Sequence, residues 1–283
     1  QPRKENIKKF LRAIEISKEI ELENIEELIN DEYEIDRSEI IETIQAGQEK
    51  LVSIQGNAGS GKSVICKKLL NGKKYVLVTR AENLSTGKNV NDLWDCDIED
   101  AILWLENKPL YIFIDAIEFI ADCGDSAFLL LQEIYRLADK YNNVYVITSC
   151  RTTDSSAFMK INTKYRIKTY EISDLTKDEI DKVAQKYPII SSLNQNKTYS
   201  DLLCVPFYLN LIISGGFVEE NIHDENNFRN LIWDRIVCLK DKCRKYGVSQ
   251  SDIRETVERI AFERASSFVV GVDRDIVDSN ILE

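Results

Sequence analysis

Short, nearly continuous apolar runs recur along the first part of the chain, and longer segments with regularly spaced polar residues separate them. The runs lie at 51–55, 74–80, 110–114 and 143–151, and the more polar segment 164–175 supplies a fifth strand. Runs of this length, bounded by polar or turn residues, are typical of parallel strands that are covered on both faces. The pattern therefore predicts five mainly parallel strands that alternate with helices, which is an α/β fold.

Helical spacing of apolar residues dominates both ends of the chain. It predicts helix over residues 5–30 and again over 224–245 and 250–266. The pair Thr176 and Glu179 forms a capping-box pattern that opens another helix after the last strand. We therefore divide the chain into an N-terminal helical linker (1–30), an α/β domain (31–173), a helical domain (174–245) and the start of a further domain (246–283).

The turn after the first strand carries the strongest chemical signal. Residues 56–63 read GNAGSGKS, which is the pattern G-x-x-x-x-G-K-[ST] between a strand and a helix. Its glycines leave room for backbone N–H groups to surround phosphates. Lys62 would contact the β and γ phosphates and Ser63 would ligate Mg²⁺, so we predict that this loop binds the phosphates of a nucleotide. The residues assigned to nucleotide binding are Gly56, Asn57, Ala58, Gly59, Ser60, Gly61, Lys62, Ser63 and Val64.

Polar residues follow two of the other predicted strands. Asp115 ends the apolar run at 110–114, where a carboxylate would hold Mg²⁺ because the phosphate loop opens at the same edge of the sheet. Glu118 lies three residues further on and is a candidate to orient or deprotonate the attacking water. At the end of the run 143–151, Thr148 or Ser149 would sense the γ-phosphate, and Arg151 would contact it directly.

Composition narrows the possible partners. The formal charge is -11, so the chain has no global basic footprint for nucleic acid, and Lys67, Lys68, Lys73 and Lys74 are interpreted as a solvated helix face. No apolar run approaches membrane-spanning length, so no membrane partner is expected. Seven cysteines without a C-x-x-C pair and a single histidine favour reduced thiols in a cytoplasmic protein. The chain begins with Gln1, and we expect it to be a piece of a larger protein.

Three local sequences resemble a known class of ATPase. An extra strand between the P-loop and Asp115 is similar to P-loop ATPases of the AAA+ group, which implies the strand order 5-1-4-3-2. IFIDAIEFI resembles the Walker B segment of STAND ATPases of the NACHT type, VITSCR their sensor 1, and LLCVPFYLNLI their adenine-side G-x-P element. The last two are most similar to bacterial antiviral defence proteins of this class.

The resemblance implies a function and assigns roles to residues. The protein would be an ATP/ADP switch that hydrolyses ATP slowly, forms a homo-oligomer on activation, and carries an N-terminal effector domain, a C-terminal sensor domain and a binding site for an unknown trigger. Catalytic roles fall to Lys62, Asp115, Glu118 and Arg151, and Mg²⁺ would be held by Ser63 and Asp115. Pro206 would lie beside the adenine and Arg37 would match an upstream nucleotide-contacting arginine. Residues 246–283 would begin a winged-helix domain.

Three other functions fit the P-loop. An AAA+ motor or loader would turn over ATP continuously and present a basic pore loop. A small-molecule or nucleotide kinase would need an arginine-rich lid, whereas the region after Arg151 is poor in arginine. A non-hydrolysing interaction scaffold would bind nucleotide without consuming it.

Overall fold

The computed structural model describes most of the chain, which divides into two compact units. The first comprises Gln1–Ile180 with Cys204–Tyr208, and the second comprises Asp181–Leu203 with Leu209–Glu283. The helix predicted at 224–245, apart from residue 230, and the strand predicted near Phe268 lie outside the described residues. Those described are 2–122, 124–152, 164–195, 197–214, 230 and 249–267.

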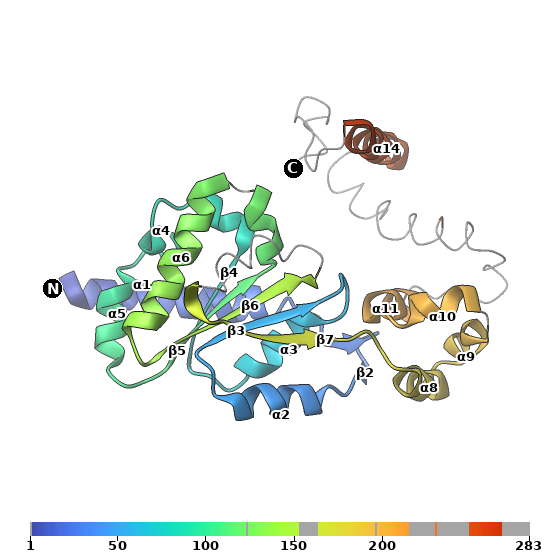
Figure 1. Ribbon diagram of the computed structural model, residues 1–283, viewed down its shortest axis with the longest axis horizontal. Helices are drawn as coiled ribbons and strands as arrows, with labels where there is room; N and C mark the ends of the chain where they lie inside the picture. Colours follow the sequence, from blue (N-terminus) through green and yellow to red (C-terminus); the bar gives the residue numbers. More distant parts are fainter. Residues whose placement is uncertain are drawn as a thin grey trace. The chain divides into compact units, whose positions relative to one another are not determined.

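A five-stranded sheet forms the centre of the first unit (Figure 1). Every neighbouring pair is parallel, and the strand order is β4-β5-β6-β3-β7. Counted along the chain, this is the predicted order 5-1-4-3-2, so the predicted fold class is confirmed. The strands are β3 (Leu51–Gly56), β4 (Tyr75–Arg80), β5 (Leu110–Asp115), β6 (Val144–Arg151) and β7 (Lys168–Ile172).

Side chains alternate between two apolar cores, one on each face of the sheet. In β5, Ile112 and Ile114 pack in one core and Phe113 packs in the other. Both cores are covered by helices (Figure 1). Those over the first core are α1 (Pro2–Ile16), α4 (Val90–Trp94), α5 (Ile98–Leu105) and α6 (Gly124–Lys140), and those over the second are α2 (Ser38–Gly47) and α3 (Lys62–Leu70).

The N-terminal helix is shorter than the range 5–30 that the spacing of apolar residues predicted. After α1 the chain makes a π-helical turn (Ser17–Leu22), and then two short antiparallel strands, β1 (Leu28–Ile29) and β2 (Tyr33–Glu34). Ile14 is buried in the first core and Leu22 in the second. The chain crosses the free edge of β4 between them, where the Val78 N–H donates to the Ser17 hydroxyl at 3.0 Å. This crossing ends the helix and satisfies an edge-strand amide.

The elements that follow β7 in the described chain are all helices. The Thr176 N–H donates to Glu179 at 2.7 Å and the Glu179 N–H donates back to the Thr176 hydroxyl at 3.3 Å, so the predicted capping box is confirmed. The helix predicted at 250–266 is also present. The helices are α8 (Lys177–Lys186), α9 (Pro188–Asn194), α10 (Lys197–Leu203), α11 (Pro206–Ser214) and α14 (Gln250–Ser267). Within the described segments, no helix combines the length and apolar character needed to span a bilayer.

Candidate nucleotide-binding site

The phosphate-loop sequence forms a turn between β3 and α3, as the pattern requires. Gly59 and Gly61 have φ values of 77° and 91°, a region that L side chains rarely adopt. The loop is closed by a hydrogen bond from the Ser60 N–H to the Asn57 carbonyl at 3.2 Å. A Cβ added at Gly61 would meet no heavy atom within 4 Å, so the space beside the start of α3 is open.

Two glycines of this loop are needed because other segments press against it. A Cβ on Gly56 would lie 2.7 Å from the Ile172 carbonyl oxygen at the end of β7. A Cβ on Gly59 would lie 2.7 Å from the Cβ of Phe207. The Phe207 N–H also donates to the Gly59 carbonyl at 3.2 Å. Pro206 is the first residue of α11 and is thereby brought beside the loop.

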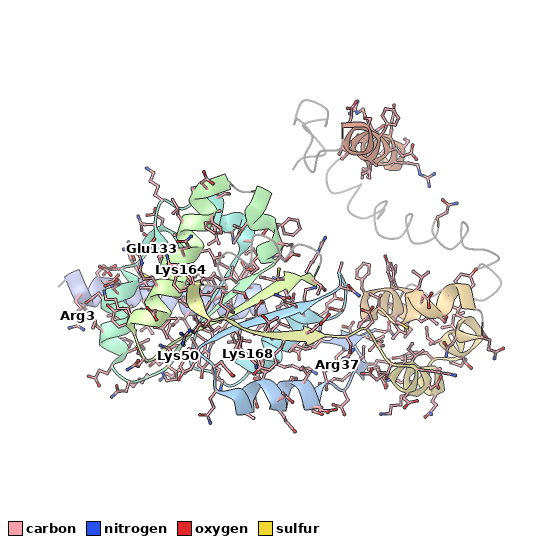
Figure 2. All side chains as sticks on the ribbon, viewed as in Figure 1. Arg3, Arg37, Lys50, Glu133, Lys164 and Lys168 are labelled. Carbon is pink, nitrogen blue, oxygen red and sulfur yellow. The ribbon has the colours of Figure 1, made fainter. Side chains whose placement is uncertain are left out.

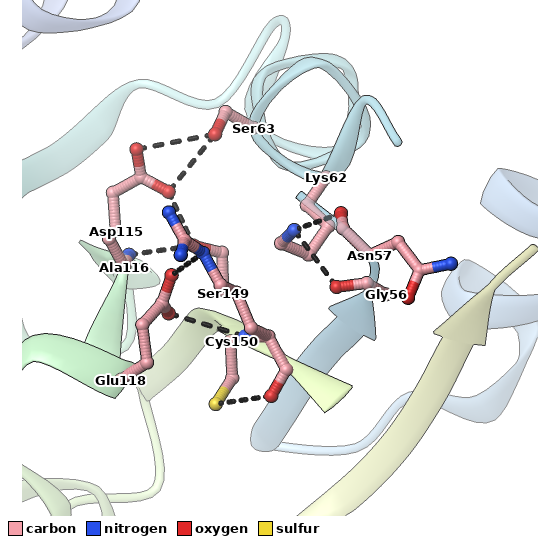
Figure 3. Close-up of polar contacts among 10 residues, drawn as sticks. Gly56, Asn57, Lys62, Ser63, Asp115, Ala116, Glu118, Ser149 and Cys150 are labelled. Carbon is pink, nitrogen blue, oxygen red and sulfur yellow. Dashed lines mark hydrogen bonds and ion pairs between the residues drawn. The ribbon is translucent and has the colours of Figure 1, made fainter. Parts of the chain in front are cut away.

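Lys62 is the first helical residue after the loop and is buried. Its Nζ donates to the carbonyl oxygens of Asn57 at 2.7 Å and of Gly56 at 3.1 Å (Figure 3). Burial lowers the pKa of Lys62, and the nearby carboxylates of Glu118 and Asp115 oppose that shift. The Lys62 ammonium group therefore donates to two loop carbonyl oxygens and lies near two acidic side chains.

Asp115 and Ser63 meet at the carboxyl edge of the sheet. The Ser63 hydroxyl donates to the two carboxylate oxygens of Asp115 at 3.0 and 3.2 Å (Figure 3). The Ser149 hydroxyl also donates to Asp115 and accepts the Ala116 N–H at 2.7 Å. Ala116 has a φ of 58°, which turns the chain sharply after the strand. Two side chains, one from α3 and one from β6, thus converge on the carboxylate at the end of β5.

The structure decides between the two hydroxyl residues proposed at the end of β6. Ser149 is on the same face of the sheet as Asp115, toward α3. Thr148 faces the other core, is fully buried, and donates to the Val52 carbonyl at 3.4 Å. The difference follows from the two-residue periodicity of a strand, so only Ser149 belongs to the site.

Glu118 and Arg151 form an ion pair beside this group. The Arg151 Nε lies 3.0 Å from Glu118 Oε1, and the Arg151 backbone N–H donates to Oε2 at 3.2 Å. The Glu118 side chain is 6% exposed and that of Arg151 is 42% exposed. The guanidinium also lies over the Phe119 ring, 5.5 Å from its centre. The two residues predicted to act on water and on the γ-phosphate therefore contact one another.

No protein-family model matches this sequence, and no curated protein does. Solved structures do match. A Walker-type ATPase of Pyrococcus abyssi is similar over 92% of both chains, at 11% identity and a TM-score of 0.53. The chain has the fold of the P-loop ATPases.

Hsp104 of S. cerevisiae in complex with ADP matches at 14% identity and a TM-score of 0.46, over 87% of this chain and 40% of the Hsp104 chain. AMPPCP-bound DnaA from Aquifex aeolicus matches at 12% identity and a TM-score of 0.40, over 87% of this chain and 95% of the DnaA chain. This chain thus spans less than half of the Hsp104 chain.

Within this P-loop ATPase fold, Arg37 is not among the residues that converge on the loop. Its guanidinium pairs with Glu179 at 3.4 Å and donates to the Ser173 carbonyl at 3.2 Å; the side chain is labelled in Figure 2. Arg37 therefore ties the start of α2 to the segment after β7. That segment reaches the loop through Asp174, whose carboxylate accepts from the Asn57 amide at 2.9 Å.

Sequence reasoning did not single out Asp174, although a signal was present. Asp174 lies close to the end of the strand predicted at 164–175, and parallel strands bring residues at such ends, including Asp115, to one edge of the sheet. The remaining loop residues take ordinary places. Ala58 is exposed, Val64 is half-buried in the first turn of α3, and Ser60 is buried with no hydrogen-bond partner for its hydroxyl among the described residues.

The side chains present fit a nucleoside polyphosphate with Mg²⁺. Open space lies beside Gly61 at the start of α3, where backbone N–H groups and the helix dipole favour an anion. Lys62 supplies a cation at the same place. Ser63 and Asp115 are oxygen ligands of the kind that Mg²⁺ prefers, and two protein ligands suffice for a Mg²⁺ that is shared with phosphates. No group of three or more metal-binding side chains occurs among the described residues.

Proposed function

We propose that this chain is the nucleotide-binding core of an ATP- and ADP-dependent molecular switch. The observation that carries the proposal is the ion pair between Glu118 and Arg151. In a P-loop ATPase the first residue is suited to take a proton from water and the second to bind a terminal phosphate. While they are paired, Glu118 is less available to take a proton from water, and Arg151 is less available to bind the terminal phosphate. This arrangement favours slow hydrolysis that is coupled to a conformational change.

The roles of the other residues follow from their positions. The loop amides and Lys62 would hold the phosphates, and Ser63 with Asp115 would hold Mg²⁺. Mg·ATP supplies the transferable phosphoryl group when it is bound. Ser149 orients the Asp115 carboxylate by donating a hydrogen bond to it. Phe207, which contacts Gly59, and its neighbour Pro206 would contact the base side of the nucleotide.

The energy available to such a switch can be compared with what it needs. Reversing a population ratio of about 1:99 takes a differential binding free energy of about 5.5 kcal/mol. A hydrogen bond to a charged group contributes roughly 1.5–3 kcal/mol. Exchange of Arg151 from Glu118 to a γ-phosphate would therefore supply part of the difference. Contacts made through Mg²⁺ by Ser63 and Asp115 would have to supply the rest.

We assign the switch to the STAND class, within antiviral defence, on the strength of three segments. These are IFIDAIEFI, VITSCR and LLCVPFYLNLI, which contain Asp115, Glu118, Arg151 and Pro206. The assignment brings with it a homo-oligomer on activation, effector and sensor domains in the same protein, a cytoplasmic location, and the division into domains at residues 31–173, 174–245 and 246–283. The trigger would act by shifting the nucleotide-dependent equilibrium.

The switch is tested by measuring turnover and assembly in the same preparation. The protein should hydrolyse bound ATP in a single-turnover experiment but show a much slower steady-state rate, limited by exchange of ADP. A non-hydrolysable ATP analogue with Mg²⁺ should raise the mass measured by light scattering, and ADP should not. Rapid, continuous turnover with no change in mass would instead support a motor and contradict the switch.

The Arg151→Met variant makes this test specific. ADP binding should be unchanged within error while the ATP-dependent increase in mass is lost, because the side chain contacts Glu118 rather than the loop and ADP has no γ-phosphate for it to bind. Arg136→Met is a matched control, since Arg136 is an exposed arginine on α6. Equal assembly by Arg151→Met and the wild-type protein would rule out the role of Arg151 as the sensor.

A further inference from the structure

A groove lined by lysines lies at the end of α3 that is remote from the P-loop. Its volume is about 350 Å³, and it is formed by the end of α3, the turn to β4 and the π-helical turn after α1. Five of the ten residues in its wall are lysines and one is acidic. These six residues are Lys18, Lys67, Lys68, Lys73, Lys74 and Glu27.

Two of the five lysines already have partners. Lys67 pairs with Glu27 at 2.9 Å and donates to the Ile25 carbonyl at 2.8 Å. Lys68 pairs with Glu34. Both stand in the last turn of α3, where cations also compensate the negative end of the helix dipole. The local structure therefore accounts for these two positive charges.

The other three lysines are not explained in this way. Lys18, Lys73 and Lys74 have no acidic partner within 4 Å among the described parts of the chain. Lys18 comes from a different segment, and the other two follow the end of α3. Lys73 lies over the Tyr111 ring and Lys74 over the Tyr75 ring, 5.2 and 5.4 Å from the ring centres. Three lysines without an acidic partner thus line one groove, whose single acidic residue, Glu27, pairs with Lys67.

The charge of the groove suits a phosphate chain. Its cations are all lysines, which bind phosphate as compact point charges. Tyr111 stacks on Tyr145, with ring centres 5.1 Å apart, so half-buried aromatic rings adjoin the basic wall. A basic groove beside aromatic residues is typical of sites for single-stranded nucleic acid. Because the chain as a whole carries a charge of -11, a bound polyanion must be attracted locally.

We propose that this lysine groove binds a phosphate chain, in the form of a single-stranded nucleic acid backbone or a free polyphosphate. The site is separate from the nucleotide site but lies at the other end of the same helix, because α3 begins at Lys62 and ends at Leu70. The interpretation of these lysines as a merely solvated helix face does not explain why cations from three segments converge.

The proposal is tested with a fluorescent single-stranded oligonucleotide, by anisotropy at several salt concentrations. The wild-type protein should bind it at low salt. The triple variant Lys18→Gln, Lys73→Gln, Lys74→Gln should bind at least tenfold more weakly, and the slope of log K against log salt should fall by about 2, because each phosphate contact in a single strand contributes about 0.7. A matched triple variant at exposed lysines elsewhere, Lys4→Gln, Lys88→Gln, Lys182→Gln, should bind as the wild type does.

Competitors distinguish the sources of the phosphate chain. Displacement by an unlabelled oligonucleotide but only weakly by inorganic polyphosphate would identify nucleic acid as the ligand, and equal displacement would identify the phosphate chain alone. Displacement by poly-glutamate at the same charge concentration would overturn the proposal, as would an equal loss of binding in both triple variants or no binding by the wild type. Lys62→Met should still bind the oligonucleotide, which separates this result from any failure of the nucleotide site.

Discussion

A single residue, Arg151, contacts both carboxylate oxygens of Glu118. Its guanidinium is 3.0 Å from Oε1, and its backbone N–H donates to Oε2 at 3.2 Å. The pair is asymmetric, because Glu118 is buried and the Arg151 side chain is partly exposed. The guanidinium can therefore leave while the backbone hydrogen bond continues to hold Glu118 in place. This makes Arg151 the mobile member of the pair and Glu118 the fixed one.

The first prediction concerns Glu118 as a general base. Glu118→Gln keeps the size of the side chain and an oxygen that can accept from the Arg151 N–H, but it cannot take a proton. Single-turnover hydrolysis should fall by roughly 10²–10⁴-fold, the usual contribution of a positioned base. ATP affinity, measured by equilibrium binding, should stay unchanged. An unaltered hydrolysis rate would remove Glu118 from the mechanism.

Lys62 should matter for binding rather than for folding. Lys62→Met preserves the aliphatic stem and removes a charge that is desolvated by burial. Loss of charged hydrogen bonds worth roughly 1.5–3 kcal/mol should weaken ATP binding by one to two orders of magnitude. Titration calorimetry measures the change, and Lys88→Met at an exposed position serves as the control. Wild-type affinity in Lys62→Met would contradict the assignment of the phosphate loop.

Removal of Mg²⁺ should separate the contribution of Asp115 to ATP binding from the contribution of the phosphate loop. In the wild-type protein, chelation of Mg²⁺ should weaken ATP binding, because Asp115 and Ser63 would no longer reach the phosphates through the ion. In Asp115→Asn, and to a lesser extent in Ser63→Ala, affinity should depend little on Mg²⁺. The comparison needs only binding curves with and without EDTA. A full Mg²⁺ effect in Asp115→Asn would place the metal elsewhere.

Two glycines with similar backbone angles offer a matched test of the packing at the loop. Gly59 and Gly72 have φ values of 77° and 73°. A Cβ at Gly72 would meet nothing within 4 Å, whereas one at Gly59 would collide with Phe207. Gly72→Ala should therefore cost only the left-handed strain of about 1–2 kcal/mol. Gly59→Ala should cost more and weaken ATP binding, as measured by denaturant unfolding and calorimetry. Equal destabilisation would mean that Phe207 does not press on the loop.

Much of the fold could be predicted from local patterns. Apolar runs predicted four of the five strands, because a strand covered on both faces leaves few polar positions until it ends. The fifth, β7, is an edge strand in which Lys168, Thr169 and Glu171 are exposed, so no such run marks it. The P-loop and Asp115 were predictable for a related reason, since both occupy strand ends at the carboxyl edge of a parallel sheet. The strand order came from the resemblance to AAA+ ATPases, and periodicity alone would not have given it.

Other features depend on contacts between distant segments, which periodicity does not encode. The helix predicted over 5–30 ends early because Ser17 meets the edge strand at Val78. The ion pair between Glu118 and Arg151 joins residues from two strand ends, each of which looked independently suited to catalysis. Arg37 pairs with Glu179, a partner far away in the sequence. Ser149, by contrast, could have been chosen over Thr148 by counting alternate positions along β6.

The claim that this P-loop ATPase fold binds an adenine nucleotide is tested most directly by identifying what the purified protein carries. The protein is incubated with Mg·ATP, freed of unbound nucleotide and denatured, and the released nucleotide is identified and quantified by chromatography. The account predicts about one adenine nucleotide, ADP or ATP, per wild-type chain and almost none from Lys62→Met. A folded wild-type protein that releases no nucleotide, and that also shows no binding when ATP is titrated into it, would contradict the account.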